Sequence, residues 1–381
     1  MESIYYVMAW ACHRRCKHCY EQRFRPYSRG ALDTVVDEAL RNFPRIIDHF
    51  PESMRYTDLA DAPDAQGQHP QKTGRVVLSG GESLLDAVRE TVTYPVIERL
   101  QQRYADKGGV KVVVQTTGDL LTDRIVGELL ERGTYMISVA SVDDFHVGLE
   151  GEAKQRAFMD KLSALFRRHG MRQSGLLATT RNWHEEEGPL FSFFGATPDS
   201  WIGKLWPRGR AWQNNLPRST LADNFCNRWS GGLNFLRHGY NGSEVSVEPD
   251  GSVYPCCVKT AMPLGNLTEE PLIDILDSLA GVPAFEAITM GHPERMGLAY
   301  GWDEARFNNA SRTTLPDGQP YENLCIGCDR FHEQVLEPVL ALARARREAA
   351  RGLTSAAAPG VVAAAGARRR TLPIQLTSVR D

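Results

Sequence analysis

The 381-residue chain has no run of 18 consecutive apolar residues and no detectable internal repeat. Residues 1–11 also lack the charged-then-apolar layout of a secretion signal. We therefore do not expect a membrane-spanning protein, and predict a cytoplasmic location. The net charge is −3, so the composition offers no basic footprint for nucleic acid, and neither nucleic acid nor membrane is expected as a partner.

Cysteine is scarce as well, with eight residues in two groups. In a chain without a leader, this favours metal binding in a reducing compartment over a disulfide framework. The first group, Cys12, Cys16 and Cys19, has the spacing Cys-x3-Cys-x2-Cys. Three thiolates hold three corners of a four-iron cubane and leave the fourth iron open to a non-protein ligand. A zinc site completed by His13 or His18 is the alternative.

Strand-like and helix-like patterns alternate through the first half of the chain, which predicts an α/β fold with a parallel sheet. Hydrophobic residues make up 42% of the sequence, enough for a large core. Helices are predicted at 32–50, 85–104, 121–132 and 154–169. Strands are predicted at 3–11, 75–79, 110–115 and 135–140, with weaker candidates at 175–179 and 201–206. Residues 51–73 are polar and predict an exposed loop.

The pattern changes from about residue 220. Residues 244–248 and 252–254 flank Pro249-Asp250-Gly251, which predicts a two-strand hairpin. Helices are predicted at 271–279 and 334–351, with an irregular polar segment at 281–320. Residues 352–381 are biased towards Ala, Arg and Pro, which predicts disorder.

Polar motifs follow several predicted strands, at the end of a barrel where chemistry is usually found. Ser79-Gly80-Gly81-Glu82 combines glycines, which permit close approach to a ligand, with a carboxylate that can accept from an ammonium group. Gln115-Thr116-Thr117-Gly118 and the segment 138–143 end two further strands. Strand-end capping is the alternative explanation for these two.

Together these motifs resemble the radical S-adenosylmethionine (radical SAM) superfamily. The resemblance implies a partial (β/α)6 TIM barrel in which Cys12, Cys16 and Cys19 hold a [4Fe–4S] cluster whose open iron binds SAM. It further implies that the cluster cleaves SAM to a 5′-deoxyadenosyl radical, which abstracts hydrogen from a substrate. The residues that it implies for SAM binding are Gly80, Gly81, Glu82, Thr117, Ser138 and Ser141. Thr117 stands where the family usually has Asn.

The second cysteine group is Cys226, Cys256, Cys257, Cys325 and Cys328. The segment 248–256 and Leu264-Gly265-Asn266-Leu267 resemble the SPASM/Twitch domains, which carry auxiliary iron–sulfur clusters. Five cysteines imply a small Twitch-like domain with one auxiliary [4Fe–4S] cluster. Its implied ligands are Cys226, Cys256, Cys325 and Cys328, although Cys257 could exchange roles with Cys256. A four-cysteine zinc ribbon is the alternative.

These interpretations divide the chain into a radical SAM barrel (1–215), a Twitch/SPASM-like domain with a β-hairpin and C-terminal helix (216–340), and a helix end with a disordered tail (341–381). We predict an enzyme of oxidoreductase type. Its substrate is a small molecule such as a sugar or aminocyclitol, since only eleven residues precede Cys12 and leave no room for a fused leader-peptide-binding domain. A peptide maturase, and a non-catalytic iron–sulfur or zinc module, are the alternatives.

Oxidation of a substrate radical requires a group that accepts a proton. Asp143, His146 and Arg210 are the candidates for this role. Flavodoxin or ferredoxin is the expected reductant.

Overall fold

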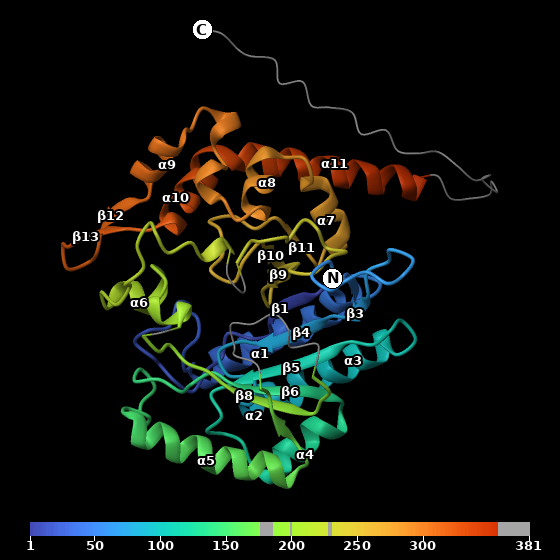
Figure 1. Ribbon diagram of the computed structural model, residues 1–381, viewed down its shortest axis with the longest axis vertical. Coiled ribbons are helices and arrows are strands. Elements are labelled where there is room, and N and C mark those ends of the chain that lie inside the picture. Colours follow the sequence, from blue (N-terminus) through green and yellow to red (C-terminus); the bar gives the residue numbers. More distant parts are fainter. Residues whose placement is uncertain (176–185, 199, 228–230, 357–381) are drawn as a thin grey trace.

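The computed structural model describes residues 1–175, 186–198, 200–227 and 231–356. In these ranges nine strands form one sheet, in the order β11-β10-β9-β1-β4-β5-β6-β8-β7. Neighbours from β9 to β7 pair in parallel, and β10 and β11 add antiparallel strands at one edge. The predicted α/β class with a largely parallel sheet is therefore confirmed (Figure 1).

The strands of the sheet are β1 (Ser3–Val7), β4 (Arg75–Ser79), β5 (Lys111–Thr116), β6 (Thr134–Val139), β7 (Arg172–Gln173), β8 (Leu190–Phe193), β9 (Glu244–Val247), β10 (Ser252–Tyr254) and β11 (Gly265–Asn266). The four strands predicted with a clear pattern, at 3–11, 75–79, 110–115 and 135–140, are confirmed as β1, β4, β5 and β6. Every residue of β4 is buried. Strands covered on both faces read as continuous apolar runs, which is why the sequence reveals them.

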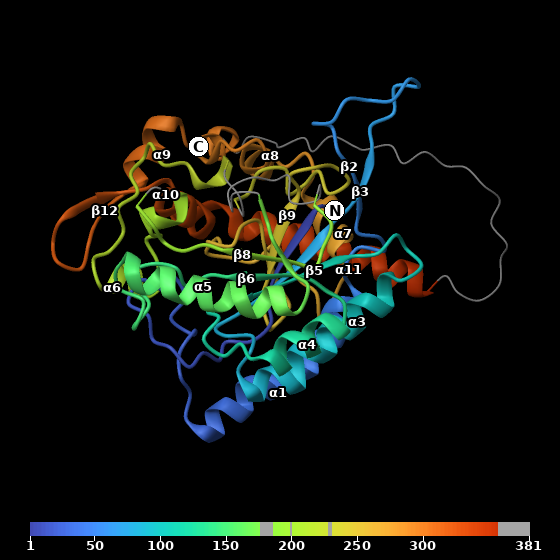
Figure 2. The same ribbon diagram turned by 60° about the horizontal axis from the view of Figure 1, so that its bottom comes forward.

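Helices follow the first strands, as the alternating pattern predicted: α1 (Arg29–Asp48), α2 (Asp86–Val88), α3 (Tyr94–Tyr104), α4 (Asp123–Glu131) and α5 (Glu152–Arg168). A π turn at Arg89–Thr93 joins α2 to α3. Thr122 begins α4 by accepting a hydrogen bond from the Ile125 amide on its side chain. Figure 2 shows α1, α3 and α4 together on one side of the sheet, where their apolar faces are buried.

Three expectations in the first 215 residues need correction. The predicted loop at 51–73 carries a small antiparallel ladder at its ends, β2 (Arg55–Thr57) with β3 (Gln71–Thr73). Trp201–Lys204 is a 3-10 helix, not a strand, because the Ser200 side chain caps it by accepting from the Gly203 amide. Strand β8 was not predicted, since its four residues are too few for a clear period. The weak candidate at 175–179 lies almost wholly outside the described residues.

The later elements are α6 (Gly209–Gln213), α7 (Leu272–Leu279), α8 (Pro283–Thr289), α9 (Glu304–Ala310), β12 (Arg312–Thr314), β13 (Pro320–Glu322), α10 (Leu324–Phe331) and α11 (Glu337–Ala356). The expectation that 281–320 is irregular is wrong, because Phe285, Ile288 and Phe307 are buried and give α8 and α9 apolar faces. Helix α11 extends to Ala356, beyond the predicted helix end. Residues 357–381 lie outside the described part.

The predicted hairpin is confirmed as β9 and β10. It is not separate from the barrel strands, because β9 pairs in parallel with β1, from Ser3 opposite Glu244 onwards. The division of the chain at 215 and 216 stays a prediction. No helix in the described ranges is both long and apolar enough to cross a membrane.

Helix α11 is held against the segment of α7 by a buried ion pair. Arg347 donates to both oxygens of Glu270, at 2.7 and 2.9 Å, and to the Ser278 hydroxyl at 2.7 Å. Both charged side chains are at most 5% exposed. Removing one partner of such a pair leaves a buried charge that is poorly compensated.

We expect Arg347→Leu to lower the free energy of unfolding by about 3 kcal/mol in a urea titration, because Glu270 stays buried with fewer partners. Arg346→Leu is the matched control, since Arg346 is the preceding residue of α11 and is exposed. Equal losses of unfolding free energy in the two variants would contradict a stabilising role of the ion pair between Arg347 and Glu270.

Candidate active site and auxiliary cysteine site

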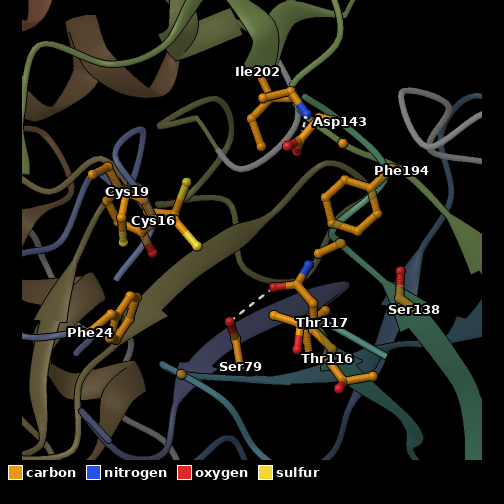
Figure 3. A pocket seen from close by; sticks show the side chains of 18 of the residues that line it. Cys16, Cys19, Phe24, Ser79, Thr116, Thr117, Ser138, Asp143, Phe194 and Ile202 are labelled. Carbon is orange, nitrogen blue, oxygen red and sulfur yellow. Dashed lines mark hydrogen bonds between the residues drawn. The ribbon is translucent and has the colours of Figure 1, made fainter. Parts of the chain in front are cut away.

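A cavity of about 310 Å³ lies where β1, β4, β5 and β6 end. In Figure 3, Cys16 and Cys19 lie on one side of it, Thr116, Thr117 and Ser138 on another. The sequence-predicted residues among its lining are Cys12, Cys16, Cys19, Gly80, Gly81, Thr117, Ser138, Asp143, His146 and Arg210. The fold thus brings together residues that are up to 200 positions apart in the sequence.

The Gly-Gly-Glu segment packs directly on the chain that leads into the cysteines. The Gly81 amide donates to the Ala9 carbonyl at 3.1 Å, and the Glu82 amide donates to that of Ala11 at 2.9 Å. A Cβ atom on Gly81 would lie 2.3 Å from the Ala11 carbonyl oxygen. Only glycine permits this approach, so Gly81 sets where Cys12 begins its loop.

Arg210 holds the cysteine loop together. Its guanidinium donates to the carbonyls of Cys16 (2.8 Å), Gln22 (3.2 Å) and Phe24 (2.7 Å), and its amide donates to that of Cys19 (2.8 Å). Helix α6, which carries it, lies beside this loop in Figures 1 and 2. These contacts support a structural role. A guanidinium stays protonated in proteins and so has no site for a further proton. Proton acceptance by Arg210 therefore stays a prediction, and these contacts do not favour it.

The Glu82 carboxylate is 2% exposed and turns towards the end of β5. It accepts from the Thr116 hydroxyl (2.7 Å), the Thr117 hydroxyl (2.6 Å), the Thr117 amide (2.8 Å) and the Leu84 amide (3.0 Å). It therefore joins the loops after β4 and β5. Direct contact of Glu82 with SAM stays a prediction, and the backbone of Gly80 and Gly81 is what lines the cavity.

Asp143 and His146 form a buried pair beside the cysteines. His146 Nδ1 donates to Asp143 Oδ1 at 2.8 Å, and Asp143 also accepts from the Phe145 and Ala196 amides. Burial raises the pKa of Asp143, but the bonds from His146 and Ala196 lower it to about 2. Burial lowers the pKa of His146, but the bonds with Asp143 and Cys16 raise it to about 9.

His18 adds to this pair a third side chain that could bind a metal ion. Ligand atoms of His18, Asp143 and His146 all lie within 4.8 Å of one another. The rings of His18 and His146 are 4.9 Å apart between centroids.

Ser141, which the sequence predicted for SAM binding, is fully buried. Its hydroxyl donates to the Thr117 carbonyl at 2.7 Å, which shapes the loop after β5.

The floor of the cavity is a polar row that sequence reasoning missed in part. The row consists of cavity-lining residues that lie side by side on the neighbouring strands β4, β5, β6 and β8, one on each strand: Ser79, Gln115, Ser138 and Ser192. Ser79 Oγ donates to Gln115 Oε1 at 2.9 Å (Figure 3), and Ser138 Oγ lies 2.9 Å from Ser192 Oγ. Tyr5 reaches both Ser79 (2.6 Å) and Gln115 (3.0 Å). A polar residue at the last inward position of each strand is the signal that could have found this row.

Four cysteines gather at a second site. Burial raises the pKa of Cys226, Cys256, Cys325 and Cys328, and the nearby thiols raise those of Cys226, Cys325 and Cys328 further. Asn323 caps α10 by accepting from the Cys325 amide at 2.8 Å. Cys257 instead lines the cavity. This grouping supports the predicted ligand set, which includes Cys256 and omits Cys257.

Cysteine spacing at both sites is wider than one zinc ion takes. With Zn–S bonds of roughly 2.3 Å, tetrahedral sulfurs lie about 3.8 Å apart. In the described part of the chain, neither cysteine group supplies three sulfurs that all lie within 4.8 Å of one another. Thiolates are the usual donors to an iron–sulfur cubane, which spans a larger distance between them.

Residues 240–286 match the family model of SPASM, an iron–sulfur cluster-binding domain. The chain carries a SPASM-type segment. This segment spans β9, β10, β11, α7 and the start of α8, and it contains Cys256 and Cys257. The expected resemblance to a SPASM domain is thereby confirmed over these residues.

No curated protein matches the chain. Remote likenesses to solved structures exist. BtrN in complex with AdoMet and 2-DOIA has 14% identity and a TM-score of 0.37 over 80% of this chain and 92% of that chain. Native anSMEcpe with bound AdoMet and Cp18Cys peptide has 14% identity and a TM-score of 0.38 over 90% and 99%. SuiB of Streptococcus suis, bound to S-adenosylmethionine, has 12% identity and a TM-score of 0.33 over 75% and 67%.

Replacement of Arg210 tests its hold on the cysteine loop. We expect Arg210→Met to lower the free energy of unfolding of the iron-free chain by about 3 kcal/mol, because three carbonyls lose a charged donor. Arg218→Met is the control, because Arg218 is exposed and its guanidinium donates to the Asn215 and Pro217 carbonyls of its own turn. A loss for Arg210→Met no larger than the control's would refute this role.

Proposed function

We propose that this protein is a radical SAM enzyme with one auxiliary [4Fe–4S] cluster. The observation that carries the proposal is the shared cavity of Cys12, Cys16 and Cys19 with the backbone of Gly80 and Gly81. Three thiols beside an open space suit a cubane with one iron free for an organic ligand. When bound, the cluster supplies the electron that cleaves SAM to methionine and a 5′-deoxyadenosyl radical.

The chain's own groups would position the reactants. The backbone of Gly80 and Gly81 permits close approach of the amino-acid end of SAM. Thr117 and Ser138, which line the cavity, would bind the rest of SAM or the substrate. Arg210 would keep Cys16 and Cys19 in place through their carbonyls. In the pair of Asp143 and His146 the imidazole already carries its proton, so Asp143 would be the member that accepts a proton released on substrate oxidation.

A small polar molecule is the substrate that we favour. The floor of hydroxyl and amide groups from Ser79, Gln115, Ser138 and Ser192 suits a ligand with several hydroxyl or amino groups, such as a sugar or an aminocyclitol. Loss of two electrons by such a substrate would make the enzyme an oxidoreductase. A cytoplasmic flavodoxin or ferredoxin would supply the electron for SAM cleavage.

The second site would hold the auxiliary cluster on Cys226, Cys256, Cys325 and Cys328. Four thiolates fill every iron, so this cluster would not bind SAM. Its proposed task is to accept an electron from the substrate radical. Cys257 would remain a thiol in the cavity wall.

Replacing Cys12, Cys16 and Cys19 together with Ala should abolish 5′-deoxyadenosine formation with dithionite and SAM. About four irons per chain should remain, because the auxiliary site is untouched. Chromatography of 5′-deoxyadenosine and an iron assay measure both quantities. Formation of 5′-deoxyadenosine by the triple variant would refute the proposed function.

The converse variant, Cys325→Ala with Cys328→Ala, should lose about four irons and keep the cluster that binds SAM. SAM cleavage without substrate should persist at a rate within about twofold of the parent. The single change Cys257→Ala is its control and should retain all irons. Zinc in place of iron at the second site, or loss of iron on Cys257→Ala, would contradict the assigned ligand set.

A further inference from the structure

His332 is a histidine that the proposed function does not yet use. It is completely buried, and neither ring nitrogen has a hydrogen-bond partner among the described residues. An imidazole carries at least one N–H in every protonation state that proteins adopt. Buried donors are nearly always paired, so an orphan donor indicates a partner other than these protein groups.

The position of His332 indicates what that partner is. His332 follows Cys328 by four residues and Cys325 by seven, so the three side chains share one face of the helix formed by α10 and the turn after it. His332 also begins a π turn, His332–Leu336, and such turns occur frequently at functional sites. Its imidazole therefore lies about one helical turn from Cys328 and about two turns from Cys325.

Arg208 presents a second orphan donor at the same place. It interacts electrostatically with Cys256, Cys325 and Cys328, and also with His332. One terminal nitrogen donates to the Lys259 carbonyl at 2.9 Å and forms an ion pair with Asp329. Its Nε is buried and has no partner in the described ranges.

We propose that His332 and Arg208 Nε donate hydrogen bonds to sulfur atoms of the auxiliary cluster and thereby raise its reduction potential. Hydrogen bonds to sulfur stabilise the reduced cluster, which carries one more negative charge. A raised potential makes the cluster a better acceptor for the electron of a substrate radical. The inference rests on the auxiliary cluster of the proposed function, and assigns positioning residues to it.

The test is a redox titration, followed by electron paramagnetic resonance, of the full-length chain in the background of the triple variant at Cys12, Cys16 and Cys19. Only the auxiliary cluster then contributes to the signal. His332→Leu removes the donor, whereas His332→Gln keeps an N–H at this position. Arg330→Gln is the matched control, because Arg330 lies on α10 but donates to the Ala310 and Arg312 carbonyls.

We expect His332→Leu to keep about four irons. Its ratio of reduced to oxidised cluster should fall about tenfold, equivalent to a decrease of about 59 mV for a one-electron couple. Arg208→Lys, which keeps the charge and removes the Nε–H, should shift the potential in the same direction. His332→Gln should lie closer to the parent, and Arg330→Gln should equal it. Loss of iron from His332→Leu but not from His332→Gln would also support a donor role.

An unchanged potential in an iron-replete His332→Leu variant would overturn the inference. Loss of iron from His332→Gln as well would also overturn it, since the imidazole would then hold iron instead of donating to sulfur. A parent chain without iron at this site would refute the auxiliary cluster itself, which the iron assay reveals before any variant is made. The two failures are therefore distinguishable.

Discussion

Strand β1 is hydrogen-bonded in parallel on both edges, to β4 and to β9, and this double pairing fixes the relation between the two cysteine sites. Parallel pairing brings the carboxyl ends of β1 and β4 together, which is why Gly81 meets Ala11 just before the first cysteine. The same strand joins the SPASM-type segment to the barrel sheet. A slip of one residue would exchange the faces of Tyr5 and its neighbours, and the cavity floor would lose its hydroxyl.

Ion pairs then connect the loops around that sheet to one another. Glu21, which follows the first cysteines, pairs with Lys259, which follows the second group, at 2.6 Å. Lys259 also pairs with Glu248 at the end of β9, and Arg23 bridges Glu21 and Glu248 at 2.7 and 3.0 Å. Lys259 has a φ of 69°, a left-handed conformation that side-chain-bearing residues seldom adopt. Its ion pairs offset that strain. Arg208 and Arg210 add a second connection, because Arg210 lies at the first cysteine group and Arg208 lies at the second.

The sequence revealed those features that depend on short stretches of chain. Buried parallel strands such as Arg75–Ser79 read as apolar runs, and the spacing of Cys12, Cys16 and Cys19 predicts a site held by three thiolates. What it did not reveal depends on contacts across the chain. The pairing of β9 with β1 joins residues about 240 positions apart, and the polar floor exists only once β4, β5, β6 and β8 are in register. Each of the four floor residues is a polar residue near the end of an apolar strand, and the pattern of one strand does not show that their side chains share one floor.

The cavity combines two kinds of surface that the proposed radical reaction would need. Its floor offers hydroxyl and amide groups that can orient a substrate, while Phe194, Ile202, Leu205 and Trp206 give other walls an apolar character. Leu205 and Trp206 are buried, so these walls are part of the core and do not rearrange freely. Apolar walls exclude water from a reactive intermediate. The thiol of Cys257 is an exception in that lining, and it places a reactive group of the SPASM-type segment inside the cavity that the barrel strands form.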